Sequence, residues 1–461
     1  MISDPDVIGI LYLVTIVCFV VALKFLSSPK HARKGNWIGG AGMLVAIATT
    51  LLIDGIGNWG LMVTGLVIGT VVGVFGARTV RMTAMPQMVA VFNGVGGGAA
   101  ALVALAEWHN AVEIGSDETV SIVLSALIGS ISFAGSVVAF AKLQELVSGR
   151  PIVFPGQNVV NVLVLLTASA LGVAAISGAE DQWLLYALIG LALAFGVMFV
   201  LPIGGADMPV VISLLNAFTG LAASATGFVL DSTVLIVSGM LVGAAGTLLT
   251  LLMAKAMNRS IANVLFGAFG QVQAGAGAAR TDDGRTVRAT TPEDVAVQLS
   301  FARKVIIVPG YGMAVAQAQH DVRQLADLLE ERGVDVRYAI HPVAGRMPGH
   351  MNVLLAEANV PYTQLSEMDE INPEFPQTDV VLVIGANDVT NPAARSDPAS
   401  PIYGMPILDV DKAASSVVLK RSMNPGFAGI DNELYLDAKT TMLFGDAKES
   451  VLKLIAAVKA T

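Results

Sequence analysis

Nine long apolar stretches lie in the first 259 residues and constrain the fold of this chain more than any other feature. A helix needs roughly 20 apolar residues to cross the hydrocarbon core of a bilayer, which is about 30 Å thick. Such stretches occur near residues 7–26, 37–53, 59–76, 86–106, 120–141, 158–177, 183–203, 208–228 and 232–254. We therefore predict a polytopic α-helical membrane domain of about nine spans, embedded in a lipid bilayer. Its many Gly, Ala, Ser and Thr residues favour close helix packing.

Charged residues are distributed unevenly along the chain. Residues 1–259 contain 22 Asp, Glu, Lys and Arg residues, whereas residues 260–461 contain 41. The first part therefore suits lipid and the second part suits water. The net charge is −9 and Lys420–Arg421 is the main basic pair, which argues against nucleic-acid binding. The single cysteine, Cys18, excludes a disulfide within the chain and a cysteine metal site, and we expect no metal.

Lysine and arginine residues lie on one side of the predicted spans. They follow the first, third, fifth and ninth spans, whereas the second, fourth, sixth and eighth connections carry only acidic charges. Because positive charge accumulates in cytoplasmic loops, we predict a multi-pass protein of the cytoplasmic (inner) membrane, with the N-terminus outside and the C-terminal part in the cytoplasm. The first stretch follows acidic residues and is expected to be a retained span, not a signal peptide. The basic residues are Lys30, Arg33, Lys34, Arg78, Arg81, Lys142, Arg150, Lys255 and Arg259.

The sequence pattern changes after residue 259. We predict a transmembrane domain at 1–259, a linker rich in Gly, Ala and Gln at 260–290, and a soluble domain at 291–461. In the soluble domain, short apolar runs alternate with amphipathic ones, which is typical of a doubly wound parallel α/β sheet of the Rossmann-like type. Strands are expected at 304–309, 334–340, 379–384, 416–419 and 441–444, and helices at 314–332 and 351–359.

A glycine motif follows the first predicted strand. Residues 310–316, Gly-Tyr-Gly-Met-Ala-Val-Ala, form a variant of the dinucleotide fingerprint and are expected to open a helix. Glycines permit the tight turn and let backbone N–H groups approach a pyrophosphate. The motif favours nucleotide binding, while a plain strand–helix turn is the alternative, because such turns also favour glycine.

Residues at other strand ends favour NADP(H) over NAD(H). An acid at the tip of the second strand would hold the ribose 2′-hydroxyl of NAD(H), but His341 stands there. Lys420 and Arg421 follow a later strand and suit a 2′-phosphate through charge-assisted hydrogen bonds. The alternative for this pair, and for Arg346 in its Gly/Pro turn, is a solvated surface position. Asp388 follows another strand at the rim where ligands bind, although it also suits a turn residue bonded to local amides.

Polar residues within the predicted spans are candidates for a hydrated path through the membrane. Asp207 begins the eighth span, Asn216 and Thr219 lie within it, and Asn93 lies within the fourth. The alternative for the asparagines is hydrogen bonding between helices. Histidines are expected outside the spans, with His109 in a loop.

Seven segments of the chain together resemble the beta subunit of the proton-translocating NAD(P) transhydrogenases. The resemblance implies that NADP(H) on this chain exchanges hydride directly with NAD(H) on an alpha subunit, coupled to proton movement across the membrane. That subunit would carry the NAD(H) domain and extra transmembrane helices, in a dimer of alpha–beta units. The matching segments are Gly204–Val211, Lys255–Ser260, Pro309–Gln317, His341–His350, Gly385–Asp388, Lys420–Asn424 and Leu443–Ala447.

The resemblance also implies roles for individual residues. Asp388 would couple the nucleotide to the membrane, and Asp207, Asn216 and Asn93 would belong to the proton path. Residues 423–429 would form a lid over the nucleotide. The cofactor-binding residues would be Gly310, Tyr311, Gly312, Met313, Ala314, Val315, Ala316, Gly345, Arg346, Met347, Pro348, Gly349, Gly385, Ala386, Asn387, Asp388, Lys420, Arg421, Ser422, Met423, Asn424, Gly426, Phe427, Gly445, Asp446 and Ala447.

One position departs from the family pattern. Asn93 stands where many relatives have a histidine that lines the proton channel, and an amide does not titrate near neutral pH. We therefore expect a partner helix to supply a histidine near Asn93. Two other classes of protein fit the sequence less well, namely a membrane transporter with an NADP(H)-sensing regulatory domain and a membrane anchor whose α/β domain docks partners.

Overall fold

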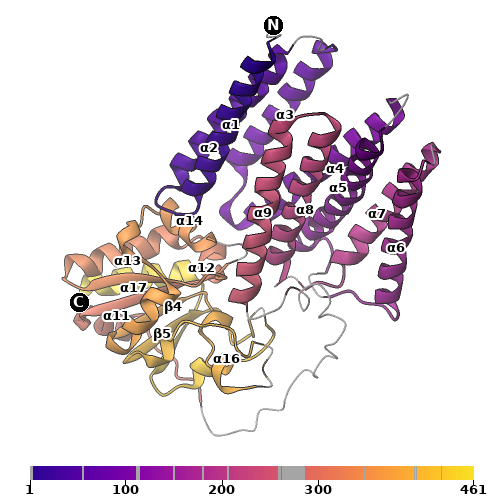
Figure 1. Cartoon of the computed structure of the whole chain (residues 1–461). Coiled ribbons are helices and arrows are strands. Elements are labelled where there is room, and N and C mark those ends of the chain that lie inside the picture. Colours follow the sequence, from indigo (N-terminus) through magenta and orange to yellow (C-terminus); the bar gives the residue numbers. More distant parts are fainter. Residues whose placement is uncertain are drawn as a thin grey trace. The chain divides into compact units, whose positions relative to one another are not determined.

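The chain divides into a helical unit and an α/β unit (Figure 1). The first comprises Met1–Leu251 with Ile261–Gly270, and the second comprises Leu252–Ser260 with Gln271–Thr461. The computed structural model describes every residue except 1–3, 54–56, 111–114, 149–150, 179–180, 205–206, 258–260, 262–285, 346–348, 399, 401 and 427, and the side chains of Met82 and Ser116. The predicted residues Arg346, Met347, Pro348, Phe427, Arg150, Arg259 and most of the linker lie outside the described part.

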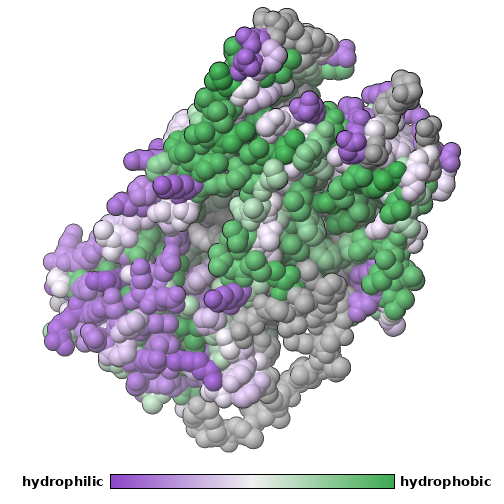
Figure 2. Space-filling model, viewed as in Figure 1, coloured by the Kyte–Doolittle hydropathy of each residue, from purple (hydrophilic) through white to green (hydrophobic). Residues whose placement is uncertain are grey.

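Nine helices of the described residues are long and apolar enough to cross a membrane. All nine predicted spans are therefore confirmed, with shifts of a few residues at their ends. Hydrophobic residues cover most of the visible surface of these helices (Figure 2), as expected of surfaces that face lipid. The helices are α1 Pro5–Leu26, α2 Ala32–Leu52, α3 Trp59–Thr79, α4 Met85–Asn110, α5 Ser116–Leu143, α6 Gln157–Ile176, α7 Gln182–Val200, α8 Met208–Val229 and α9 Thr233–Ala256.

Glycines bring several of these helices into backbone contact. Helix α5 packs against α4, α7 and α8. A Cβ atom added to Gly129 of α5 would lie 2.6 Å from the carbonyl oxygen of Gly97 in α4, and one added to Gly220 of α8 would lie 2.6 Å from the amide nitrogen of Gly243 in α9. Because neither interface has room for a side chain, the small residues noted in the sequence are required for this packing.

Two residues that we placed outside the spans lie inside helices. His109 is in the last turn of α4, so its predicted loop position is wrong, and Lys142 is in the last turn of α5. Both helices continue beyond their apolar runs, because polar and cationic side chains at a helix C-terminus interact favourably with the helix dipole. Helix ends therefore cannot be read from hydropathy alone.

The α/β unit contains a parallel sheet of six strands in the order β3-β2-β1-β4-β5-β6. The five predicted strands are confirmed, whereas β3 was not predicted because its three residues are too few to form a pattern. The strand order reverses between β1 and β4, which is the switch point where open α/β sheets bind ligands. The strands are β1 Lys304–Pro309, β2 Asp335–Ile340, β3 Leu365–Glu367, β4 Val380–Ile384, β5 Ser415–Lys420 and β6 Thr440–Phe444.

The helix predicted at residues 314–332 is wrong as a single element. The chain forms α12 (Tyr311–Ala316) and α13 (Gln319–Glu331), because Gln317 has a φ of 53° in the left-handed region and ends the first helix. The predicted helix at 351–359 corresponds to α14 (His350–Glu357). The other helices of the unit are α11 Pro292–Phe301, α15 Met368–Ile371, α16 Ala393–Ser396 and α17 Ala447–Ala460, with short 3₁₀ helices that include η6 Asp388–Thr390 and η8 Glu433–Leu436.

The two faces of the sheet are covered differently. Helix α17 packs against α11, α12 and α13 on one side (Figure 1). On the other side, Ile306 and Val383 of the sheet pack with Phe375 and Leu434 from short 3₁₀ segments. Alternate strand residues face opposite sides, so both faces are buried and the loops at the strand ends are held by short, closely packed segments.

The end of the predicted linker pairs with the edge of the sheet. Thr290 donates its backbone N–H to the carbonyl oxygen of Met442 at 3.0 Å, and Met442 donates to the carbonyl oxygen of Arg288 at 2.8 Å. Val287 packs against the buried core of the same unit. Ala289 therefore forms an isolated parallel bridge with Met442 at the β6 edge of the sheet.

Candidate functional site

Two glycine turns meet at the switch point between β1 and β4. Gly310 donates its backbone N–H to the carbonyl oxygen of Ile384 at 2.9 Å, and Gly312 donates to that of Gly385 at 2.9 Å. A Cβ atom added to Gly310 would lie 2.4 Å from the Cα of Ala386, and Gly385 has a φ of +69°. The glycines thus let the two turns pack backbone to backbone. Two of the amides expected to approach a pyrophosphate are used here by β4 and its turn.

Helix α12 presents a mixed set of side chains. Met313 and Ala314 are fully buried and belong to the protein core, whereas Val315 is half-exposed. The ring of Tyr311 lies 6.4 Å from that of His350, the first residue of α14. A Cβ atom on Gly345 would lie 2.6 Å from His350 Nδ1, so Gly345 lies against the first residue of α14. The structure therefore brings Gly345 and Tyr311, from two predicted glycine motifs, to the same histidine.

The acidic turn after β4 contacts Gly426 and Ala428, two residues of the segment 423–429 that was predicted to be a lid. Asp388 Oδ2 accepts a hydrogen bond from the backbone N–H of Ala428 at 2.9 Å. A Cβ atom on Gly426 would lie 2.5 Å from both Asp388 Oδ1 and Asn387 Nδ2, so this position has room only for glycine. These sequence-predicted residues, more than 30 positions apart in the chain, are in direct contact.

A buried polar cluster joins this turn to the segment after the lid. Asn387 Oδ1 accepts hydrogen bonds from Tyr435 Oη at 2.7 Å and from Asn432 Nδ2 at 3.1 Å. Asn432 Nδ2 also donates to the backbone oxygen of Asn387 at 3.0 Å. Sequence reasoning missed Asn432 and Tyr435, because no motif marks them and their partner lies more than 40 residues earlier. A buried asparagine beside a 3₁₀ turn in a crossover is a signal that is visible only in the structure.

The basic pair lies at the end of β5, beside this cluster. Lys420 donates to the carbonyl oxygen of Asn424 at 2.6 Å, and its Nζ lies 5.5 Å from the centre of the Tyr435 ring. Burial lowers the pKa of Lys420, while the charges of Asp388 and Asp431 act in the opposite direction. Arg421 is exposed. The pair thus offers one fixed and partly desolvated cation and one cation that reaches solvent.

The end of β6 lies next to that of β5. Gly445 donates its N–H to the carbonyl oxygen of Lys420 at 3.1 Å. Asp446 caps α17, accepting hydrogen bonds from the N–H groups of Lys448 at 3.0 Å and Glu449 at 3.4 Å. Its carboxylate therefore stabilises the helix N-terminus, a local role that sequence reasoning did not assign to it.

In the helical unit, a buried polar cluster joins α4, α5 and α8. Asn93 donates to Ser136 Oγ at 2.9 Å, and the hydroxyls of Ser132 and Thr219 lie 2.6 Å apart. Asn93 also lies 3.4 Å from Ser132 Oγ, so the predicted residues Asn93 and Thr219 are brought together. Sequence reasoning missed Ser132 and Ser136, whose spacing of four places them on one face of α5.

Asp207 and Asn216 occupy other positions on α8. Asp207 is buried at the N-cap position of the helix, while Asn216 is half-buried. Neither takes part in the hydrogen bonds of the Asn93 cluster among the described residues. The cluster therefore includes two of the four polar residues that the sequence singled out.

Lys142 is a buried cation that sequence reasoning treated as a loop charge. Its side chain is 3% exposed and its Nζ donates to the carbonyl oxygens of Leu201 and Ile203, the second at 2.8 Å. These two carbonyls follow the C-terminus of α7. The ammonium therefore satisfies backbone groups that the end of that helix leaves without partners.

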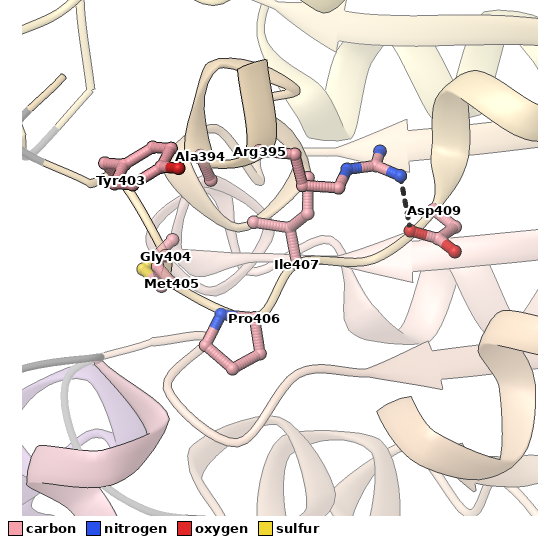
Figure 3. A pocket seen from close by; sticks show the side chains of 8 residues that line it. All are labelled: Ala394, Arg395, Tyr403, Gly404, Met405, Pro406, Ile407 and Asp409. Carbon is pink, nitrogen blue, oxygen red and sulfur yellow. Dashed lines mark ion pairs between the residues drawn. The ribbon is translucent and has the colours of Figure 1, made fainter. Parts of the chain in front are cut away.

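A pocket of about 390 Å³ opens beside α16 (Figure 3). Arg395 at its rim pairs with Asp409 at 3.0 Å. Tyr403, Pro406 and Ile407 line its wall. None of the predicted cofactor-binding residues lines this pocket.

The fold and the site define a polytopic membrane protein with a Rossmann-like nucleotide-binding domain. The model of a family described as the NAD(P) transhydrogenase beta subunit matches residues 8–457. The NAD(P) transhydrogenase subunit beta of Rhodospirillum rubrum is 50% identical over 455 residues, which cover 97% of this chain and 98% of that protein. A second Rhodospirillum rubrum sequence with the same name matches with the same values. The chain belongs to the NAD(P) transhydrogenase beta subunit family, as the resemblance of its motifs predicted.

Proposed function

We propose that this chain binds NADP(H) at the crevice between β1 and β4 and exchanges hydride directly with NAD(H) held by an alpha subunit. The exchange is coupled to proton movement across the membrane. The observation that carries the proposal is the meeting of three elements at the carboxyl ends of the strands: the Gly310–Gly312 turn, the Asn387–Asp388 turn and Lys420. Open α/β sheets bind dinucleotides at the carboxyl ends of their strands.

The residues at this edge fit a dinucleotide. Glycines at 310 and 312 let the turn after β1 pack directly against the turn after β4, which forms the edge where a dinucleotide would lie. Lys420 and Arg421 supply cations for a 2′-phosphate, which NADP(H) has and NAD(H) lacks. Asn387 Nδ2 is buried with no hydrogen-bond partner among the described residues, and a ligand oxygen would satisfy it. We assign the predicted cofactor-binding residues to this site.

The chain's own residues bind and orient the cofactor, which when bound supplies the hydride acceptor or donor. Lys420 and Arg421 hold its phosphate end. Asp388 accepts a hydrogen bond from Ala428, so that a change in the charge of this carboxylate changes its hold on Ala428. This contact supports a role for Asp388 in coupling nucleotide binding to proton movement.

The partner is an alpha subunit that carries the NAD(H) domain and further transmembrane helices. The name of the relative, subunit beta, supports such an assembly. We propose a dimer of alpha–beta units in the cytoplasmic membrane. The positive charges that follow alternate spans support an N-terminus outside and an α/β unit in the cytoplasm.

The proton path runs through the helical unit. Asn93, with Ser132 and Thr219, supplies polar lining, and Asp207 and Asn216 continue the path along α8. None of the hydroxyl or amide groups titrates near neutral pH. A histidine of the partner's helices near Asn93 therefore serves as the proton carrier.

The test uses the full chain with its alpha subunit in sealed vesicles. Hydride transfer from NADPH to an NAD⁺ analogue is followed by absorbance, and the internal pH is followed with a trapped dye. The proposal expects both signals, each dependent on both subunits. NADPH binding without hydride transfer would indicate a transporter with a sensing domain, and absence of NADPH binding would indicate a membrane anchor.

A further inference from the structure

The side chain of Asn387 has a fixed orientation. Leu434 donates its backbone N–H to Asn432 Oδ1 at 2.9 Å, which identifies the oxygen of this amide. The other end of the Asn432 amide is therefore the Nδ2 donor. That Nδ2 points at Asn387, to which it can only donate. Asn387 must therefore present its oxygen on this side and its own Nδ2 on the opposite side.

Tyr435 secures this orientation. Its hydroxyl donates to the same Oδ1 at 2.7 Å, and its ring is almost fully buried. Burial raises the pKa of the Tyr435 hydroxyl far above its usual value, so the group keeps its proton and remains a donor. Two donors on one amide oxygen oppose a flip of the Asn387 side chain, because a flip would set its Nδ2 against the Nδ2 of Asn432.

The outward Nδ2 of Asn387 is buried and has no hydrogen-bond partner among the described residues. It lies beneath Gly426, where a Cβ atom would come within 2.5 Å of it. Leaving a buried amide donor without a partner is unfavourable. Such a group in a native structure points to a ligand acceptor that takes this place.

We infer that Tyr435 and Asn432 are positioning residues that aim Asn387 Nδ2 at an acceptor oxygen of the bound NADP(H). The inference rests on the proposed function and adds the origin of the site's geometry. The same tyrosine ring lies beneath Lys420, so one side chain fixes both the cation at the end of β5 and the amide at the end of β4.

The test measures NADPH affinity and thermal unfolding on the full chain in detergent. Tyr435→Phe keeps the ring and removes the hydroxyl that holds Asn387. We expect NADPH affinity to fall about threefold to tenfold, the loss of one net hydrogen bond. Tyr338→Phe is the matched control: Tyr338 is fully buried in β2, its hydroxyl has no hydrogen-bond partner among the described residues, and its loss leaves affinity unchanged.

Asn387→Asp tests the Nδ2 donor itself, because it removes this donor and keeps an oxygen that accepts from Tyr435 and Asn432. The carboxylate still accepts from Tyr435 and Asn432, so the side chain keeps its orientation, but the donor towards the ligand is lost. We expect NADPH affinity to fall at least about tenfold. When Asn387→Asp is already present, Tyr435→Phe should weaken NADPH binding no further, because Tyr435 acts on the ligand only through Asn387 Nδ2.

A shorter ligand locates the acceptor. If Asn387→Asp weakens binding of NADPH but not of adenosine 2′,5′-bisphosphate, the acceptor lies on the nicotinamide half. If both weaken, it lies on the phosphates of the adenosine half. Unchanged NADPH affinity in Asn387→Asp, or additive effects of the two substitutions, overturns the inference while NADPH binding by the wild type still supports the proposed function. Failure of the wild type to bind NADPH overturns the proposed function itself.

Discussion

Asp388 Oδ2 accepts a hydrogen bond from the backbone N–H of Ala428 at 2.9 Å. This bond joins the turn after β4 to Ala428, a residue of the segment proposed to be a lid. An ionised carboxylate accepts such a bond more strongly than a neutral carboxylic acid. Protonation of Asp388 would therefore weaken its bond to Ala428, as the proposed coupling role requires.

The first prediction concerns Asp388→Asn. The amide oxygen still accepts from Ala428, so NADPH affinity should stay within about threefold of the wild-type value. The titratable proton is lost, so proton pumping in sealed vesicles with the alpha subunit should be abolished. Asp431→Asn is the control, because Asp431 also acts on Lys420 but does not bond the lid through Ala428. Full pumping by Asp388→Asn would contradict the role assigned to Asp388.

The second prediction concerns cofactor selectivity. Arg421 is exposed at the end of β5 and is free to reach a 2′-phosphate, whereas Lys420 already donates to Asn424. Loss of one charge-assisted contact costs about 1.5–3 kcal/mol, so Arg421→Ala should weaken NADPH binding roughly ten- to a hundredfold. NADH binding should not change. An equal loss for both nucleotides, or the same loss in Lys459→Ala on α17, would show that Arg421 does not recognise the phosphate.

The architecture was accessible from the sequence because it follows from periodic, local patterns. A membrane span needs a long apolar run and a buried parallel strand needs a short one, and both are visible without an alignment. Strand β3 escaped prediction because Leu-Ser-Glu has no pattern. The break at Gln317 escaped because a glutamine in the left-handed region has no sequence signature.

Only part of the candidate site could be predicted from the sequence. Glycine turns and the basic pair carry motifs, so their positions could be predicted. Tyr435 and Asn432 act on Asn387 through contacts across more than 40 residues, and Ser132 acts on Thr219 across two helices. Such contacts depend on tertiary packing, which a single sequence does not reveal. Lys142 was misjudged for the same reason, since only the end of α7 explains its burial.

The third prediction concerns the polar cluster of the helical unit. Asn93→Leu removes the donor to Ser136 and places hydrocarbon where polar lining stood. Each rise of about 1.4 kcal/mol in a barrier slows a step tenfold, so proton translocation should fall at least about tenfold. NADPH binding should persist. Thr167→Val is the control, because the Thr167 hydroxyl bonds a carbonyl of its own helix, α6. Normal pumping by Asn93→Leu would exclude a path beside this residue.

The fourth prediction concerns Lys142. Lys142→Met keeps the volume of the side chain but leaves the carbonyls of Leu201 and Ile203 without their buried donor. Hydrogen bonds to a charged group contribute about 1.5–3 kcal/mol each, so the free energy of unfolding in detergent should fall by about 3 kcal/mol. Lys255→Met removes an exposed lysine from the last turn of α9 and should have little effect. Equal stability of both variants would show that Lys142 does not stabilise the end of α7.

The last prediction concerns pH and His341, which follows β2. His341 Nδ1 accepts from the N–H of Val343 at 3.2 Å, so Nε2 carries the proton and donates to the carbonyl oxygen of Pro406 at 2.8 Å. Burial lowers the pKa of His341 to about 4. Between pH 6.5 and 4 the folded state thus binds fewer protons than the unfolded state. The contribution of His341 to the free energy of unfolding is therefore fully present above pH 6.5 and is lost as the pH falls. From pH 7 to pH 5 the loss amounts to about 2 kcal/mol.

Hydrogen exchange of the amides of β2 in the full chain, corrected for its intrinsic pH dependence, measures this loss. His341→Gln keeps one donor and one acceptor but does not titrate, so it should remove this part of the pH dependence, whereas His320→Gln at an exposed position should retain it. The same slope in wild type and His341→Gln would show that His341 is not the group that titrates.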